Sequence, residues 1–195
     1  MEPELFEVLS ELEMQDQKER MRNLPSAERI KAMDPDAAKL LSILAASNKA
    51  KNIVEVGSGV GYSTLWLAYA ASLTGGKVLA CELDPTTAET LRANVEQAGM
   101  SAYVQILVGD ARDTLRQREE PVDFLFLDAQ KDLYETYFDV VYKRMGVGAL
   151  VVADNVTSHA DELLDFITYM QNHPSLESVS VPLGRGLEVT VKTAE

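Results

Sequence analysis

From residue 35 onward, hydrophobic residues occur in two patterns that alternate along the chain: short continuous runs and residues at helical spacing. Short apolar runs predict buried strands at residues 52–56, 77–83, 103–108, 123–128, 149–154, 176–181 and 186–191. Between most of these runs, apolar residues recur at helical spacing. They predict helices at residues 35–47, 63–73, 86–98, 133–142 and 160–171, with a short helix near Ala111. Strands that alternate with helices indicate βαβ units and a parallel sheet.

The last two strands differ from the others because no helix separates them. The residues PLGRG, 182–186, are all that join them, so we expect an antiparallel β-hairpin at one edge of the sheet. The predicted fold is α/β: a doubly wound, Rossmann-like, mostly parallel seven-stranded sheet that ends in this hairpin. Ligands of such sheets bind beyond the carboxyl ends of the strands, where the strand order reverses.

The first 34 residues have a pattern of their own. Leu5, Val8, Leu9 and Leu12 recur at helical spacing, and Pro25 and Pro35 interrupt the helical pattern later. We expect a helical arm or cap at residues 1–34, followed by one catalytic domain at residues 35–195. The amphipathic spacing fits packing on the body and packing on a second chain equally well.

Composition narrows the possible partners. The net charge is −13, from 31 acidic and 18 basic residues, which makes a nucleic-acid partner unlikely because such partners need Lys and Arg against their phosphates. No apolar run is long enough to cross a bilayer, and the acidic N-terminus does not resemble a signal peptide. One cysteine, Cys81, cannot form an internal disulfide. We therefore expect a cytoplasmic protein with no membrane contact.

A glycine-rich loop follows the strand at residues 52–56. Gly57, Gly59 and Gly61 allow a tight strand-to-helix turn and close approach of a ligand to the backbone. Glu82 ends the next strand, where a carboxylate can accept hydrogen bonds from ribose hydroxyls. Together these features predict a cofactor that contains adenosine.

The spacing of the loop distinguishes between cofactors. Dinucleotide-binding loops have the pattern G-x-G-x-x-G, whereas this loop is G-x-G-x-G and follows Glu55. A buried carboxylate opposes a pyrophosphate and suits a cationic sulfonium. Asp110, in the sequence GDA at 109–111, either contacts an adenine amino group or caps the helix at Ala111. The combination predicts S-adenosylmethionine.

Two other strands end in oxygen-bearing side chains. Asp128 ends the strand at 123–128, with Lys131 three residues later, and Asp154 and Asn155 end the strand at 149–154. Taken on their own, Asp154 and Asn155 also fit the cap of a helix. Together with Asp128, they form an oxygen-only set suited to Mg²⁺, or to another hard divalent cation such as Ca²⁺ or Mn²⁺. In that case Asp128, Asp154 and Asn155 are metal ligands and Lys131 is a catalytic neighbour.

Five motifs in order resemble the cation-dependent O-methyltransferases, the group that contains catechol and caffeoyl-CoA O-methyltransferases: VEVGSGVGYS, CELDP, GDA, FLDAQKDLY and ADNV. The resemblance implies S-adenosylmethionine, a divalent metal and an aromatic diol substrate. It assigns the metal to Asp128, Asp154 and Asn155, and makes Lys131 the base. The cofactor residues that it implies, together with those inferred above, are Glu55, Gly57, Gly59, Gly61, Ser63, Glu82, Gly109, Asp110, Ala111 and Asp128. It also implies that the arm at residues 1–34 covers the acceptor pocket and joins a homodimer.

Three further residues are candidates for contact with the substrate. Glu188 matches the position where the animal catechol enzymes place a glutamate against a substrate hydroxyl. Arg185 stands where the family usually has aspartate, and either meets an acidic substrate or lies on the surface. His159 either lines the mouth of the site or starts a helix facing solvent. Gln130 departs from the family too, because the catechol enzymes have a tryptophan there that packs on the adenine.

Other functions compete with transfer to a small catechol. Some relatives of this kind methylate a hydroxylated tRNA base, which the charge of −13 disfavours. A nicotinamide-dependent oxidoreductase is disfavoured by the glycine spacing and by the lack of a Tyr-x-x-x-Lys element. A non-catalytic protein that binds S-adenosylmethionine is disfavoured by the presence of Asp128, Lys131, Asp154 and Asn155.

Overall fold

A computed structural model describes residues 2–25 and 28–195 of the chain. Its elements are, in order, α1 (Pro3–Met21), α2 (Pro35–Ser47), β1 (Asn52–Val56), α3 (Tyr62–Thr74), β2 (Lys77–Glu82), α4 (Pro85–Gln97), β3 (Val104–Val108), α5 (Ala111–Arg116), β4 (Val122–Leu127), the 3₁₀ helix η2 (Lys131–Leu133), α6 (Tyr134–Tyr142), β5 (Met145–Asp154), α7 (Ala160–Asn172), β6 (Leu176–Val181) and β7 (Leu187–Lys192). Every strand and helix expected from residue 35 onward is present.

The strands form one seven-stranded sheet in the order β3-β2-β1-β4-β5-β7-β6. Strands β1 to β5 pair in parallel, whereas β7 runs antiparallel to both β5 and β6. This arrangement confirms the predicted fold. The strand order reverses between β1 and β4, so the crevice at their carboxyl ends is where a ligand of this fold binds.

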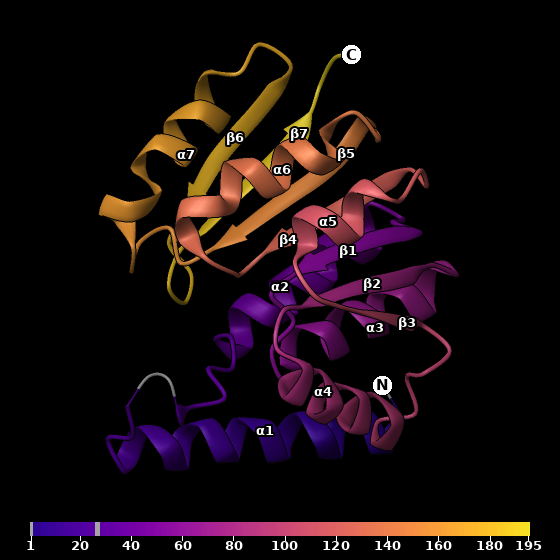
Figure 1. Ribbon diagram of the computed structural model, residues 1–195, viewed down its shortest axis with the longest axis vertical. Helices are drawn as coiled ribbons and strands as arrows, with labels where there is room; N and C mark the ends of the chain where they lie inside the picture. Colours follow the sequence, from indigo (N-terminus) through magenta and orange to yellow (C-terminus); the bar gives the residue numbers. More distant parts are fainter. Residues whose placement is uncertain (1, 26–27) are drawn as a thin grey trace.

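Hydrophobic side chains fill both faces of the sheet. Successive strand residues point to opposite faces, so Phe124 and Phe126 of β4 join the core on the side of α1 to α4. Leu125 and Leu127 join the core on the side of α5, α6 and α7. Figure 1 shows these two helical layers around the sheet. Because both faces are covered, β4 is apolar throughout its length apart from Asp123.

The N-terminal helix α1 packs on the body of the same chain, against α3 and α4 (Figure 1). Its four buried side chains, Leu5, Val8, Leu9 and Leu12, belong to the same core as the sheet. The opposite side of α1 exposes Phe6, Met14 and Met21. The homodimer and the domain division at residue 34 stay predictions.

The observed extent of strand β5 differs from the extent that the hydrophobic pattern predicts. It begins at Met145, ahead of the apolar run at 149–154, because Met145 pairs with Val122 of β4 across a register shift. The first part of β5 contains Gly146 and Gly148, and because glycine has a low strand propensity the sequence pattern does not predict a strand there.

In the part of the chain that the structure describes, no helix combines the length and apolar character needed to cross a membrane.

Candidate active site

The glycine loop turns sharply between β1 and α3. Gly57 has φ +91°, and a Cβ atom on it would lie 2.3 Å from the carbonyl oxygen of Asp128. Gly61 has φ +101°, and its Cβ would lie 2.6 Å from Cδ1 of Leu91. Any side chain at these positions would therefore push the loop away from the end of β4 or from α4. The absence of side chains keeps the loop against the carboxyl ends of the strands.

Glu55 is buried below this loop and does not line the cavity beside it. Its carboxyl accepts hydrogen bonds from Ser63 Oγ at 2.5 Å and from the hydroxyl of Thr64. Burial raises the pKa of Glu55 to about 7, although these hydrogen bonds lower it. Glu55 is thus separated from the cavity where the cofactor is expected, and its contact with the cofactor stays a prediction. Glu55 instead positions Ser63, which does line the cavity.

A cavity of about 450 Å³ lies at the carboxyl ends of β1, β2 and β4. Its lining includes most of the predicted site residues, brought together from separate segments: Gly57, Gly59, Ser63, Glu82, Gly109, Asp110, Ala111, Asp128, Lys131, Asn155, His159 and Arg185. Gly61 is at the N-cap of α3, behind this lining. Asp154, the remaining predicted metal ligand, is 2% exposed and absent from this lining, so the cavity brings together most but not all of the predicted constellation.

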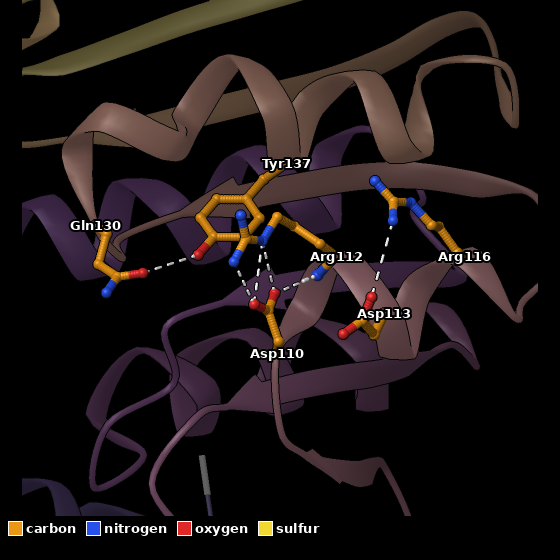
Figure 2. A network of polar contacts seen from close by, with 6 residues as sticks. All are labelled: Asp110, Arg112, Asp113, Arg116, Gln130 and Tyr137. Carbon is orange, nitrogen blue, oxygen red and sulfur yellow. Dashed lines mark hydrogen bonds and ion pairs between the residues drawn. The ribbon is translucent and has the colours of Figure 1, made fainter.

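The two carboxylates beyond β2 and β3 are held by different partners. Glu82 accepts hydrogen bonds from the backbone N–H of Gly59 at 2.8 Å and of Asp84 at 2.9 Å. Asp110 caps α5 by accepting from the N–H of Arg112 at 2.8 Å, and its Oδ2 pairs with Arg112 Nη2 at 2.6 Å (Figure 2). The Arg112 guanidinium lowers the pKa of Asp110. Asp110 is thus a helix cap that also faces the cavity.

An aromatic ring borders the same part of the cavity. Tyr137 of α6 lines it and is 5% exposed. Its Oη donates a hydrogen bond to Gln130 Oε1 at 3.3 Å (Figure 2). Burial raises the pKa of Tyr137, which favours the neutral phenol. Gln130, the residue that departs from the tryptophan of the catechol enzymes, therefore holds a neighbouring aromatic ring at the cavity wall.

Lys131 lies beside Asp128 at the end of β4. Its Nζ is 3.0 Å from Asp128 Oδ1 and donates to Tyr134 Oη at 2.8 Å. The Tyr134 hydroxyl in turn donates to the backbone carbonyl of Asp154 at 3.2 Å. The Lys131 side chain is 11% exposed and lines the cavity. This chain of contacts joins the ends of β4 and β5 through the ammonium group.

Asp154 and Asn155 end β5 next to Asp128. Burial, followed by the nearby charge of Asp128, raises the pKa of Asp154 to about 7. Asn155 has φ +72°, and its Nδ2 is buried without a hydrogen-bond partner among the described residues. No cluster of three His, Cys, Asp or Glu side chains suited to a metal occurs in that part of the chain. The predicted ligand set has two carboxylates and one amide.

The candidate substrate residues separate into two groups. His159 and Arg185 line the cavity, and the Arg185 carbonyl accepts from the N–H of Thr157 and of Ser158, both at 3.0 Å. Glu188 is absent from the lining. It is 1% exposed, and its carboxylate accepts hydrogen bonds from Gln171, Ser178 and Ser180 on the α7 side of the sheet. The expectation that Glu188 faces a substrate hydroxyl is therefore corrected.

Several cavity residues were not among the predicted site residues. Tyr62, Tyr137, Lys31 and Met33 all line the cavity. The tyrosines follow helical spacing like core residues, and the other two lie in the arm before α2, which has no periodic pattern. Tyr62 also donates to Glu13 of α1 at 2.6 Å, which ties the arm to the cavity wall. No signal in the sequence links these separate segments.

Residues 5–192 of the chain match the model of the family described as O-methyltransferase. The chain belongs to this O-methyltransferase family. It is 40% identical over 129 residues to a catechol O-methyltransferase from Niastella koreensis, a match that covers 64% of this chain and 58% of that relative. It is 31% identical over 162 residues to a catechol O-methyltransferase from Mycobacterium tuberculosis, over 77% of this chain and 73% of that one. The family and enzyme class indicated by the five motifs are confirmed.

Solved structures of the family have the same architecture. An O-methyltransferase from Bacillus cereus in complex with SAH aligns with a TM-score of 0.81 at 27% identity, over 96% of this chain and 91% of that chain. TomG, an O-methyltransferase from Streptomyces achromogenes in complex with SAM, aligns with a TM-score of 0.82 at 28% identity, over 96% and 90%. Membership of this family also excludes the alternative of a nicotinamide-dependent oxidoreductase.

Proposed function

We propose that the protein transfers a methyl group from S-adenosylmethionine to one hydroxyl of a small aromatic diol, with a divalent cation as cofactor. The observation that carries this proposal is that Asp128, Lys131 and Asn155 line the same cavity as the glycine loop. A methyl donor held by the loop is then next to the groups that bind the acceptor. The relatives named catechol O-methyltransferase support a diol as the acceptor.

The residues of the loop and of the strand ends suit the cofactor. Ser63 and the backbone around Gly57 and Gly59 border the cavity where the methionine part would bind. Glu82 retains free lone pairs for ribose hydroxyls, since each of its oxygens accepts one backbone hydrogen bond. Two relatives of known structure are complexes with SAH or SAM, which supports the same cofactor here.

The residues at the ends of β4 and β5 fit a hard divalent cation. Asp128 and Asp154 are close enough for the charge of one to raise the pKa of the other, an electrostatic repulsion that a divalent cation would relieve. In Asn155 the amide oxygen, which carries the lone pairs, would be the ligand atom. Asp128, Asp154 and Asn155 would hold Mg²⁺, Ca²⁺ or Mn²⁺. When bound, the cation supplies Lewis acidity and orients two adjacent oxygens of the diol.

Lys131 is the candidate for handling the proton of the reacting hydroxyl. Its Nζ faces the cavity from a largely buried position, fixed by Asp128 on one side and by Tyr134 on the other. Burial raises the pKa of Tyr134, so this phenol stays neutral and keeps donating to the Asp154 carbonyl. In its neutral amine form Lys131 would accept the hydroxyl proton and become an ammonium beside Asp128, while the surrounding contacts hold its position.

Methyl transfer from labelled S-adenosylmethionine to a panel of catechols, caffeate and caffeoyl-CoA tests this function. The assay is run with Mg²⁺, with EDTA, and with EDTA followed by excess Mg²⁺. We expect transfer that EDTA abolishes and Mg²⁺ restores. Transfer that persists in EDTA would contradict the metal requirement. Cofactor binding without transfer to any member of the panel would contradict the diol acceptor and turn the search to hydroxylated tRNA.

A further inference from the structure

The charged side chains that line the cavity differ in whether they have a partner within the protein. Three carboxylates line it in the described part of the chain: Glu82, Asp110 and Asp128. Glu82 accepts from two backbone N–H groups, Asp110 pairs with Arg112, and Asp128 pairs with Lys131. Each carboxylate thus has its partner within the protein.

Two cations that line the cavity have no such partner. Across residues 2–25 and 28–195, neither Lys31 nor Arg185 takes part in an ion pair or a side-chain hydrogen bond. Both side chains border the cavity in a protein whose net charge is −13. Lys31 is exposed and Arg185 is half-buried, and unpaired cations at the wall of a cavity attract an anionic ligand.

The two cations belong to one rim of the cavity. A Cβ on Gly184, next to Arg185, would lie 2.7 Å from Cβ of Asp34 and 3.2 Å from Cβ of Ala37. The β6–β7 hairpin therefore touches the start of α2, three residues after Lys31. Asp34, at this contact, caps α2 by accepting from the N–H of Asp36 and of Ala37. It is directed at the helix and forms no ion pair with either cation.

The other side of Arg185 is anchored at the acceptor end. Its carbonyl accepts from Thr157 and Ser158, which directly follow Asn155 of the predicted metal set. The neighbouring Gly186 is packed so closely on Thr157 that a Cβ would lie 2.1 Å from Oγ1 of Thr157. The rim is thus attached through Arg185 to the segment that follows β5.

We propose that Lys31 and Arg185 form an anion-recognising rim that selects aromatic diols carrying a carboxylate. This inference rests on the proposed function, since it assumes that the diol is bound at Asp128, Asp154 and Asn155. The diol end of the acceptor lies toward these residues, and its carboxylate lies toward the rim. A neutral catechol of the same size leaves both cations without a partner.

The test compares two acceptors, 3,4-dihydroxybenzoate and its methyl ester; the ester removes the negative charge of the ring substituent and adds one methyl group. The measured quantity is the ratio of kcat/KM for the acid to kcat/KM for the ester, in the wild type and in Lys31→Met and Arg185→Gln. Differences in intrinsic reactivity cancel when ratios are compared. We expect each variant to lower the ratio about fivefold, the effect of one partly shielded ion pair. Arg185→Lys should retain most of the preference.

Two cations elsewhere serve as matched controls. Lys49 is exposed and has φ +54°, close to the +53° of Lys31, but does not line the cavity. Arg92 is exposed on α4 and is also absent from the lining. Lys49→Met and Arg92→Gln change the net charge equally and should leave the ratio unchanged. A similar fall in the controls would mean that overall charge, and not the rim, sets the preference.

Calorimetric titration of both compounds into the protein with S-adenosylhomocysteine and Mg²⁺ tests the rim without turnover. The rim predicts that the wild type binds the acid more tightly and that Arg185→Gln loses this difference. Equal binding of acid and ester by the wild type overturns the rim. Weaker binding of S-adenosylhomocysteine by Lys31→Met, with an unchanged ratio, also overturns it, because Lys31 would then serve the cofactor carboxylate. Failure of methyl transfer with binding preference intact counts against the proposed function alone.

Discussion

Replacing Glu55 by glutamine should change how the stability of the protein depends on pH. Glu55 is fully buried, and its carboxyl accepts hydrogen bonds from the hydroxyls of Ser63 and Thr64. Glutamine has the same shape and keeps one acceptor oxygen, but it cannot ionise. Glu55→Gln therefore removes a buried titration while leaving the volume of the core unchanged.

The magnitude follows from the pKa of this carboxyl. Burial raises it from an ordinary value of 4.5 to about 7, so the folded state binds the proton more tightly than the unfolded chain. Between these two values the folded protein carries more protons, and the free energy of unfolding falls as the pH rises. At about 1.4 kcal/mol for each pKa unit, Glu55 lowers the stability by about 3 kcal/mol between pH 4 and pH 8.

The assay is urea unfolding of the wild type and of Glu55→Gln, without cofactor, at pH 5, 6, 7 and 8. The difference in free energy of unfolding between the two proteins isolates Glu55, because the other carboxyls, including Asp154, titrate in both. At pH 5 the variant should be less stable than the wild type or equal to it, since one hydroxyl must rearrange against the new NH₂ group. By pH 8 the difference should have moved about 2 to 3 kcal/mol from its value at pH 5, in favour of the variant.

A difference that stays constant from pH 5 to pH 8 would refute this reasoning. It would mean that Glu55 keeps the same pKa in the folded and unfolded states, so that the two hydroxyls compensate fully for its burial. A difference that moves the opposite way would mean that the hydrogen bonds outweigh burial. The slopes of the urea transitions need to agree between the two proteins for the comparison to hold.

Two further predictions concern the cavity. Lys131→Met should lower kcat about 10²- to 10⁴-fold with an almost unchanged dissociation constant for S-adenosylmethionine, measured by calorimetry. Lys131→Arg should be similarly slow, because arginine keeps the charge beside Asp128 but cannot accept a proton. An active arginine variant would contradict the role of Lys131 in proton transfer. Gly57→Ala should lose about 1–3 kcal/mol of stability in urea unfolding, because its Cβ would lie 2.3 Å from the Asp128 carbonyl oxygen. Gly59→Ala is the control, since a Cβ there meets nothing within 4 Å; equal losses would show that backbone strain alone, without the contact to Asp128, explains the effect.

Local patterns in the chain were sufficient for the architecture. The apolar runs and helical spacings define the strands and helices from residue 35 onward, and the missing helix between the last two strands predicts the antiparallel β7. Parallel strands then bring their carboxyl ends to one edge, so the polar residues after β1, β2, β3, β4 and β5 had to meet there. The glycine loop, Glu82, Asp110 and Asp128 could be placed at one site by this rule alone.

Side-chain direction and packing between distant segments could not be predicted this way. Glu188 lies on a strand beside the site, but the alternation of β7 and the hydroxyls of Ser178 and Ser180 hold it on the α7 side. Glu55 precedes the glycine loop in sequence, but its strand direction places it beneath the loop, against Ser63. A shift of one position along a strand reverses the face, and spacing to a motif does not report it.

The sequence by itself determined the fold, the family and the edge of the sheet where the chemistry occurs, because periodicity and strand-end motifs are local properties. Tertiary structure alone decided which side chains enter the cavity and which charges remain unpaired there. Lys31 and Arg185 are far apart in the chain, and they share one rim because the β6–β7 hairpin packs on the start of α2. Such pairing depends on contacts between segments, which no local pattern encodes.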